Sequence, residues 1–237
     1  MNFKNRKLIH ASLLLNALFI SGILLAFLKI GSPRYLFYLA QNRGQGITSL
    51  KKHRTSLLAT LPKKMDKIVM LGNSITAECE WAELLDNQQV INRGVIGDGT
   101  EDILNRLNDI VEMKPKKVFL LVGVNDLQFI PLSKILENYE KIINRLRTEA
   151  PATTLFLASI LPIHNDLRRT GMKNEDINVL NSGIQKLAEK YQLTYIDVAA
   201  KLKNTEGSLR EDLSLDGIHL NGEGYGLVAK EFANFAR

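Results

Sequence analysis

The sequence from residue 67 onward alternates between short apolar runs and longer stretches whose apolar residues repeat at helical spacing. In one such stretch Ile135, Tyr139, Ile142 and Leu146 share one face of a predicted helix. Five short runs are predicted as strands, namely residues 68–71, 90–92, 118–122, 155–160 and 195–198. The third and fourth are almost entirely apolar, as in parallel strands that helices cover on both faces. This alternation predicts a three-layer α/β domain around a five-stranded parallel sheet.

The basic character of the chain is confined to its N-terminal part. The net charge is +6, yet residues 1–65 hold eleven of the 31 Lys and Arg residues and no Asp or Glu. The other 172 residues carry 20 basic and 25 acidic side chains, a net charge of −5. Such a domain repels a polyanion, so we expect no nucleic-acid partner.

Residues 8–28 form a run of 21 residues without a charge, preceded by three basic residues. A helix needs about 20 apolar residues to cross a bilayer. The run is open to three interpretations: a retained anchor, a cleaved signal peptide and a buried core helix. It ends in Phe27 and Leu28 rather than in the small residues of a cleavage site. We therefore favour a membrane anchor over residues 1–30.

Residues 31–65 are basic and contain a short aromatic stretch that includes Tyr35 and Phe37. We interpret them as a juxtamembrane stalk near the headgroups, or alternatively as a solvated linker with two short helices. Basic residues lie on both sides of the apolar run, and those before it favour an extracytoplasmic position for residues 66–237. A chain that begins near Lys63 should keep full function, since every candidate site residue lies beyond it.

Small and polar residues stand where four of the predicted segments end. These are Gly72-Asn73-Ser74, Asn92-Arg93-Gly94, Gly123-Val124-Asn125-Asp126 and, before the last helix, Asp216-Gly217-Ile218-His219. In a parallel α/β sheet, ligands bind at the carboxyl ends of the strands. The four segments are therefore expected to meet in one crevice.

Ser74, His219 and Asp216 have the side chains that acyl transfer requires. A serine hydroxyl needs a base within hydrogen-bond reach, and a carboxylate can orient that base. Taken alone, Ser74 could instead cap a helix, and the Asp216/His219 pair could be metal ligands or a local loop contact. No further His or Cys stands nearby to complete a metal set, so we expect no metal.

Gly94 and Asn125 meet a second requirement of acyl transfer, because the tetrahedral intermediate carries an oxyanion that needs N–H donors. We expect the backbone N–H groups of Ser74 and Gly94 and the Asn125 amide to supply them. Each of these residues could alternatively serve only a turn. Their occurrence in one predicted crevice favours the functional interpretation.

The same four segments resemble, in order, the motifs of the SGNH/GDSL hydrolase superfamily, particularly its platelet-activating-factor-acetylhydrolase-like acyl esterases. The resemblance covers about residues 67–237. It implies a flavodoxin-like strand order, a Ser74/Asp216/His219 triad, and an oxyanion hole of Ser74, Gly94 and Asn125. Asn73 departs from the family, which commonly has Asp there. Thr76 stands where a G-x-S-x-G elbow would have its second Gly, which argues against an α/β-hydrolase.

This resemblance implies an esterase that removes a short acyl group, most simply acetyl, from a glycan or a lipid. An acyltransferase to a sugar hydroxyl would use the same residues. A non-catalytic phosphate or flavin module is the third alternative, although Gly94, Gly97 and Gly99 do not have the spacing of a nucleotide fingerprint. No cofactor is implied, and the single Cys79 is interpreted as a packing residue.

Overall fold

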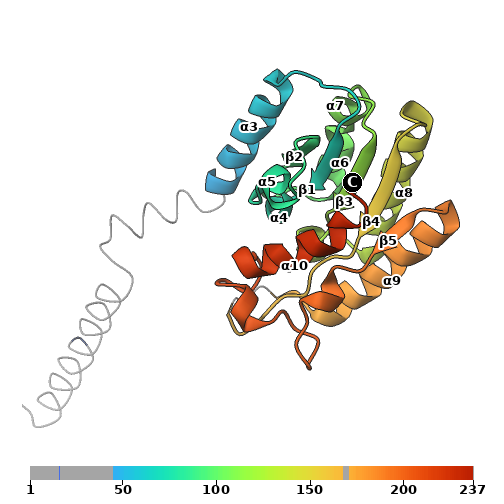
Figure 1. The fold of residues 1–237 in the computed structure, drawn as a ribbon. Helices are drawn as coiled ribbons and strands as arrows, with labels where there is room; N and C mark the ends of the chain where they lie inside the picture. The colour runs from blue at the N-terminus through green and yellow to red at the C-terminus, as the bar shows by residue number, and fades with distance from the viewer. Residues whose placement is uncertain (1–15, 17–44, 168–170, 237) are drawn as a thin grey trace, which may run out of the picture. The chain divides into compact units, whose positions relative to one another are not determined.

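The computed structural model describes residue 16 and residues 45–167 and 171–236. The chain divides into two compact units, and the site lies in the second, Leu50–Arg237. This unit is built on the strands β1 (Ile68–Gly72), β2 (Val90–Gly94), β3 (Lys117–Leu121), β4 (Thr154–Ala158) and β5 (Thr194–Ile196). All neighbouring strands pair in parallel, in the order β2-β1-β3-β4-β5 (Figure 1). The predicted five-stranded parallel sheet is confirmed, and so is its flavodoxin-like order.

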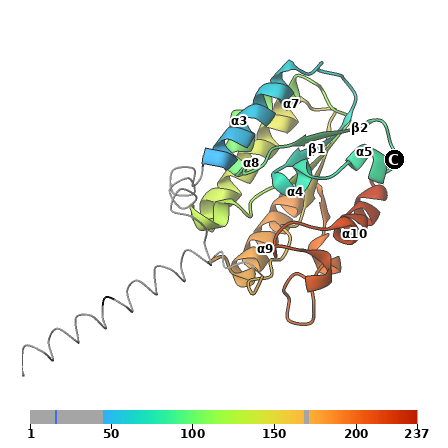
Figure 2. The same ribbon diagram turned by 90° about the vertical axis from the view of Figure 1, so that its left-hand side faces the viewer.

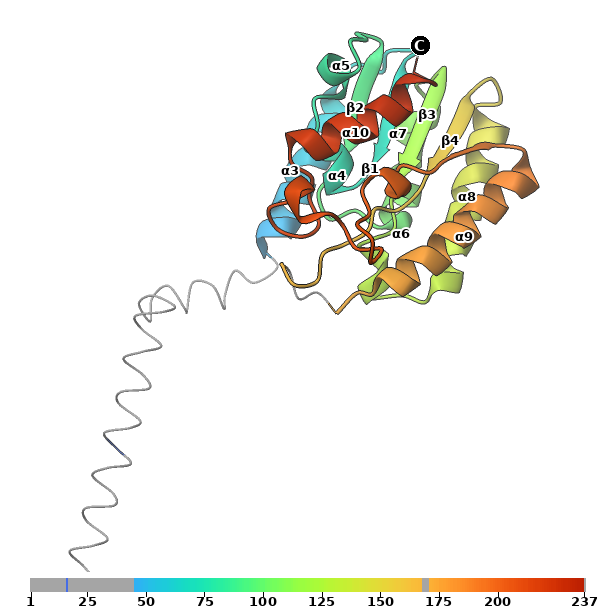
Figure 3. The ribbon, with the colours of Figure 1, turned by 60° about the horizontal axis from the view of Figure 1, so that its bottom comes forward.

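Two hydrophobic clusters cover the two faces of the sheet. Along β1, Val69 and Leu71 belong to one cluster, and Ile68 and Met70 belong to the other, as the two-residue period of a strand requires. The first cluster contains residues of α6 (Thr100–Asn105), α7 (Leu107–Val111), α8 (Leu132–Glu149) and α9 (Asn174–Tyr191). The second contains residues of α4 (Ser74–Ala77), α5 (Trp81–Leu84) and α10 (Gly222–Ala233). Figure 3 shows α10 crossing the strands on this second face.

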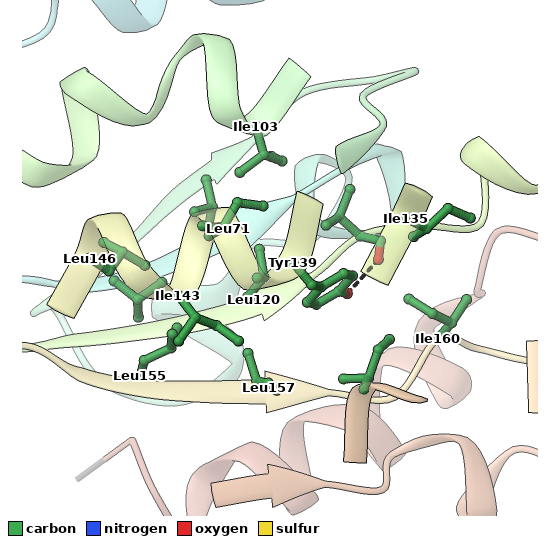
Figure 4. Packing of buried hydrophobic residues seen from close by; sticks show 14 of the residues in the cluster. Leu71, Ile103, Leu120, Ile135, Tyr139, Ile143, Leu146, Leu155, Leu157 and Ile160 are labelled. Atoms are coloured by element: carbon green, nitrogen blue, oxygen red, sulfur yellow. Dashed lines mark hydrogen bonds between the residues drawn. The ribbon is translucent and has the colours of Figure 1, made fainter. Parts of the chain in front are cut away.

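A buried tyrosine ties α8 to the end of the central strand. Tyr139 is fully buried in the first cluster, and its hydroxyl donates a 2.5 Å hydrogen bond to the Val122 carbonyl, just beyond β3 (Figure 4). Burial raises the pKa of this phenol well above its usual value, so the hydroxyl stays a donor. The segment that leads from β3 to Asn125 is thus fixed from the helix layer.

The helix α3 (Gln45–Thr60) precedes the sheet and falls in the stretch that the sequence suggested as a stalk. From Leu50 onward it belongs to the same compact unit as the sheet. Leu58 is buried and lines a small cavity together with Ile110 of α7 and Met113, and Figure 2 shows α3 alongside α7. Residues 50–60 are therefore part of the folded domain rather than a stalk that leads to it.

No helix within the described ranges is long and apolar enough to span a membrane. The predicted anchor over residues 8–28 lies outside those ranges, apart from residue 16. The anchor stays a prediction.

Candidate active site

Ser74 lies at the first position of α4, directly after β1, and Asn73 precedes it as the helix cap. The Asn73 Oδ1 atom accepts a 3.0 Å hydrogen bond from the Ile75 N–H. The cap is therefore provided by Asn73, and the Ser74 hydroxyl takes no part in it. Its side chain instead points to the loop before α10.

The Ser74, His219 and Asp216 side chains form a continuous chain of hydrogen bonds. The Ser74 Oγ atom lies 2.9 Å from His219 Nε2, and His219 Nδ1 lies 2.8 Å from Asp216 Oδ2. A carboxylate on Nδ1 favours the tautomer that carries its proton there, which leaves Nε2 to accept the serine proton. The three residues that sequence reasoning singled out are brought together in the geometry of a nucleophile, a base and an orienting acid.

Asp216 is held in its ionised form by its own loop. Burial alone raises the pKa of this carboxyl, but hydrogen bonds from the His219 and Ile218 N–H groups and from the His219 ring outweigh it. The net result is a pKa of about 2. The two backbone bonds to Oδ1 are 2.8 Å from His219 and 3.0 Å from Ile218. The carboxylate is thus charged throughout the pH range in which esterases work.

A tight turn between Ser214 and Leu220 presents the Asp216/His219 pair. The Ser214 hydroxyl donates to the His219 carbonyl at 2.7 Å and accepts from the Gly217 N–H at 2.9 Å. Gly217 has a φ of +81°, and a Cβ atom there would stand 2.4 Å from the His164 carbonyl. Only glycine fits both conditions. The turn therefore holds the His219 backbone in place, which limits where its imidazole ring can lie.

Asn92, in the second motif, links β2 to the nucleophile helix. Its amide nitrogen donates to the carbonyls of Thr76 and Cys79, at 2.8 and 2.9 Å. Its Oδ1 atom accepts from the Gly94 N–H at 2.8 Å. A Cβ atom on Gly94 would stand 2.2 Å from the Ala77 nitrogen, so this glycine allows β2 and α4 to approach closely. The Gly94 N–H, which we expected to be an oxyanion donor, is already bound in this structure.

Asn125 and Gly97 line the same open hollow of about 240 Å³, with Gly99, Asp126 and Phe129 among its other walls. The Asn125 amide donates one hydrogen bond to the Asp98 carbonyl at 3.0 Å, and its second N–H is left for another acceptor. No described residue accepts a hydrogen bond from the Gly97 N–H. Sequence reasoning noted Gly97 only for its spacing, because three glycines in six residues gave no signal for which N–H is free.

The segment that carries Asn125 is held by a buried polar network. The Asp126 carboxylate accepts hydrogen bonds from both the N–H and the hydroxyl of Thr100, at 3.0 and 2.7 Å. Asn138 of α8 donates to the same hydroxyl at 3.0 Å. Burial raises the pKa of Asp126, and the two Thr100 bonds oppose that rise. The end of β3 is thereby bonded to the start of α6.

The described ranges contain neither a metal-ligand cluster nor an ionised cysteine. No group of three His, Cys, Asp or Glu side chains there could hold a metal ion. Cys79 is buried, and burial raises the pKa of its thiol to about 12, so it carries no thiolate at neutral pH.

A parallel α/β sheet that presents a serine, a histidine and an aspartate in hydrogen-bond contact at its carboxyl edge has the structure of a serine hydrolase. The chain belongs to the GDSL-like Lipase/Acylhydrolase family, whose profile matches residues 70–227. The resemblance stated above is confirmed, and the protein is an esterase-type acylhydrolase.

Curated relatives include platelet-activating factor acetylhydrolase IB subunit alpha2 of Rattus norvegicus, which is 24% identical over 188 residues. That alignment covers 76% of this chain and 80% of the relative. The alpha1 subunit of Homo sapiens is 24% identical over 194 residues, which are 79% of this chain and 82% of the relative.

Solved structures of similar fold include a lipase/acylhydrolase from Enterococcus faecalis, with a TM-score of 0.61 and 28% identity. It covers 72% of this chain and 96% of its own length. The acetyl xylan esterase AlAXEase has a TM-score of 0.61 and 24% identity, covering 71% of this chain and 98% of its own. At 24% identity, the similarity to AlAXEase shows a shared fold and no more.

Proposed function

We propose that this acylhydrolase works through an acyl-serine, with Ser74 as nucleophile, His219 as general base and Asp216 as the group that orients the imidazole. The observation that carries this proposal is the hydrogen-bond chain of 2.9 and 2.8 Å through these three side chains. A serine placed there can lose its proton to His219 as it attacks an ester carbonyl.

The reaction then takes two similar steps. Ser74 Oγ bonds to the carbonyl carbon, His219 Nε2 takes the serine proton, and the carbonyl oxygen becomes an oxyanion. When the intermediate collapses, the bond to the leaving alkoxide breaks and His219 returns the proton to it. A water molecule, deprotonated by His219, attacks the acyl-serine in the same way and releases the carboxylic acid.

For the oxyanion we propose three donors, namely the Ser74 N–H, the Gly97 N–H and the second N–H of the Asn125 amide. The Ser74 N–H is available because the first N–H groups of a helix have no partner within it. We propose the Gly97 N–H rather than the expected Gly94 N–H as the second donor, because the Gly94 N–H already donates to Asn92 Oδ1. Donors of this kind act mainly in the transition state.

We propose a short acyl group, acetyl in the simplest case, carried by a glycan or a lipid. The support is the names of similar proteins, which are a platelet-activating factor acetylhydrolase and an acetyl xylan esterase. The test is hydrolysis of a series of chromogenic esters from acetyl to long acyl chains, with and without sugar acceptors. Fastest release from the acetyl ester supports the proposal, and acyl transfer to a sugar would replace it with the acyltransferase alternative.

The nucleophile is tested on the same preparation. Ser74→Ala should abolish turnover, with a loss on the order of 10³-fold or more, while the thermal midpoint changes little. A serine-directed phosphonate should label the wild-type chain at Ser74 alone. Turnover above about a tenth of the wild-type value in the folded variant would reject Ser74 as the nucleophile.

We also propose that the apolar run over residues 8–28 anchors the chain in a membrane, with the catalytic domain on the extracytoplasmic side. The support is its length and lack of charge. The full chain should stay with membranes after a carbonate wash, and protease added to intact cells should release the domain. Protection from protease would place the domain on the cytoplasmic side, and release of a shortened soluble chain would indicate a cleaved signal peptide.

A further inference from the structure

One face of α3 is directed at the catalytic domain. Lys51, Arg54 and Leu58 follow one another at helical spacing, and the first two are half-buried and the third is buried. Lys52 and His53, on the other side of the helix, are exposed. The apolar end of this face packs near α7, whereas its basic end meets the segment after β2.

Lys51 contacts that segment directly, and Arg54 contacts the end of β2 that leads into it. Lys51 Nζ lies 2.5 Å from Asp102 Oδ2 and 3.3 Å from Asp98 Oδ1. The Arg54 guanidinium donates to the carbonyls of Gly94 and Asn92, at 3.2 and 3.4 Å. The helix α3 therefore contacts the last residues of β2, just before the segment 95–99, and contacts that segment itself at Asp98.

Asp98 connects these contacts to the candidate oxyanion hole. Its side chain is 1% exposed, and its other carboxylate oxygen lies 2.7 Å from Arg106 Nε. Its backbone carbonyl accepts the 3.0 Å hydrogen bond from the Asn125 amide. Gly97 precedes it in the chain. The residue that Lys51 contacts thus orients one proposed donor and adjoins another.

We propose that Lys51 and Arg54 of α3 are positioning residues that hold the segment 95–99 so that Gly97 and Asn125 face the reacting carbonyl. This inference rests on the proposed oxyanion hole. Lys51 touches no reacting atom and acts only through Asp98 and its neighbours.

The energetic reason lies in the buried Asp98 carboxylate. Burial raises its pKa, and Arg106 and Lys51 oppose that rise. No hydrogen bond satisfies Asp98 Oδ1, and Lys51 is the cation beside that oxygen. A buried carboxylate that loses one of its two cations is poorly compensated, so the segment is expected to move to reach water. Displacement of oxyanion donors by about 1 Å is enough to slow turnover strongly.

The test compares Lys51→Met with the matched control Lys52→Met in the full chain. Lys51→Met should lower kcat about 10-fold with KM within about twofold, because oxyanion donors act in the transition state. Lys52→Met removes the same charge from the same helix and should leave kcat unchanged. Lys51→Arg keeps a cation beside Asp98 and should recover most of the lost turnover. The thermal midpoint is measured on every preparation.

Backbone hydrogen exchange provides a readout that does not depend on activity. Lys51→Met should speed exchange in residues 95–99 and leave β1 and β3 as protected as in the wild type. Equal kcat for Lys51→Met and Lys52→Met, or exchange that is faster throughout the domain, would overturn the proposal. A wild-type chain that hydrolyses no ester would reject the proposed function instead. In that case unchanged exchange in residues 95–99 would reject the role of α3 as well.

Discussion

At the scale of single residues, Asp216 shows how local backbone hydrogen bonds set the charge of a proposed catalytic group. Its pKa of about 2 lies below the unfolded value, so the group stabilises the fold fully above about pH 4. That stabilisation is lost as the pH falls through the folded value. Asp216→Asn cannot titrate, and its amide presents a donor to His219 Nδ1, which favours the wrong tautomer.

We therefore expect Asp216→Asn to lower kcat by about 10²–10⁴-fold at neutral pH. We also expect its free energy of unfolding to approach that of the wild type as the pH is lowered from 4 to 2. Urea unfolding of both chains across this range measures the difference. A stability gap that stays constant below pH 4 would show that the Asp216 carboxylate does not carry the depressed pKa.

Asn125 combines a structural hydrogen bond with a proposed catalytic one. Its amide already donates to the Asp98 carbonyl, so Asn125→Ala removes one structural bond as well as one proposed donor. We expect kcat to fall by about 10²–10³-fold with a smaller change in KM. Kinetics and the thermal midpoint are measured together. A lowered midpoint with normal turnover of the folded fraction would assign Asn125 to the turn alone.

At the scale of elements, α8 fixes the end of β3 through one buried hydroxyl. Tyr139→Phe removes the donor to Val122 and leaves that carbonyl unsatisfied in the core. The expected loss is about 1–3 kcal/mol in the free energy of unfolding, as for other buried groups left without a partner. Chemical unfolding measures it, with Tyr191→Phe as a control on a less buried tyrosine. An effect no larger than that of the control would show that the carbonyl finds another donor.

The sequence predicts the strands and the long helices better than it predicts the contacts of α3. The strands and the long helices can be predicted from the spacing of their apolar residues. Continuous apolar runs, such as those that contain Val118 and Leu155, are typical of strands buried between two helix layers. The proposed triad could be anticipated from residue type, from the position of Ser74 after a strand, and from the family resemblance. The contact face of α3 could not, because its partners for Lys51 and Arg54 are Asp98 and backbone carbonyls far along the chain. From sequence alone, the basic residues 31–65 therefore predict a juxtamembrane stalk or a solvated linker.

Gly97 shows the same limit within the site. The sequence places glycines at 94, 97 and 99, but which N–H is free depends on what Asn92 does with its side chain. That side chain links β2 to α4 and takes the Gly94 N–H, a contact with no sequence pattern of its own. Periodicity reports which face is buried, whereas a particular hydrogen bond depends on the final backbone positions.

At the scale of the whole molecule, some of the basic residues of the N-terminal stretch form ion pairs with acidic residues of the domain. Part of the basic N-terminal stretch neutralises the acidic domain, since Lys51 meets Asp98 and Lys63 forms an ion pair with Asp109 and Glu112. Leu58 adds the buried apolar contact of the same helix. The expectation that a chain starting near Lys63 keeps full function is therefore revised.

We expect a chain beginning at Gln45 to match the full-length protein in thermal midpoint and turnover, because it keeps the contacts of α3 from Leu50 onward.

A chain beginning at Lys63 loses Leu58, whose burial stabilises the fold by about 2 kcal/mol, together with Lys51 and Arg54. For a domain of this size that corresponds to a midpoint lower by about 4–8 °C. The loss of the Lys51 cation beside the buried Asp98 carboxylate adds to this difference. Salt screens a buried pair far less than an exposed one, so raising the salt concentration should not remove the difference. Turnover should fall with the midpoint, because the end of β2 then lacks Arg54 and the segment that follows it lacks Lys51. Equal midpoints and equal turnover in the two shortened chains would show that α3 is dispensable to the domain.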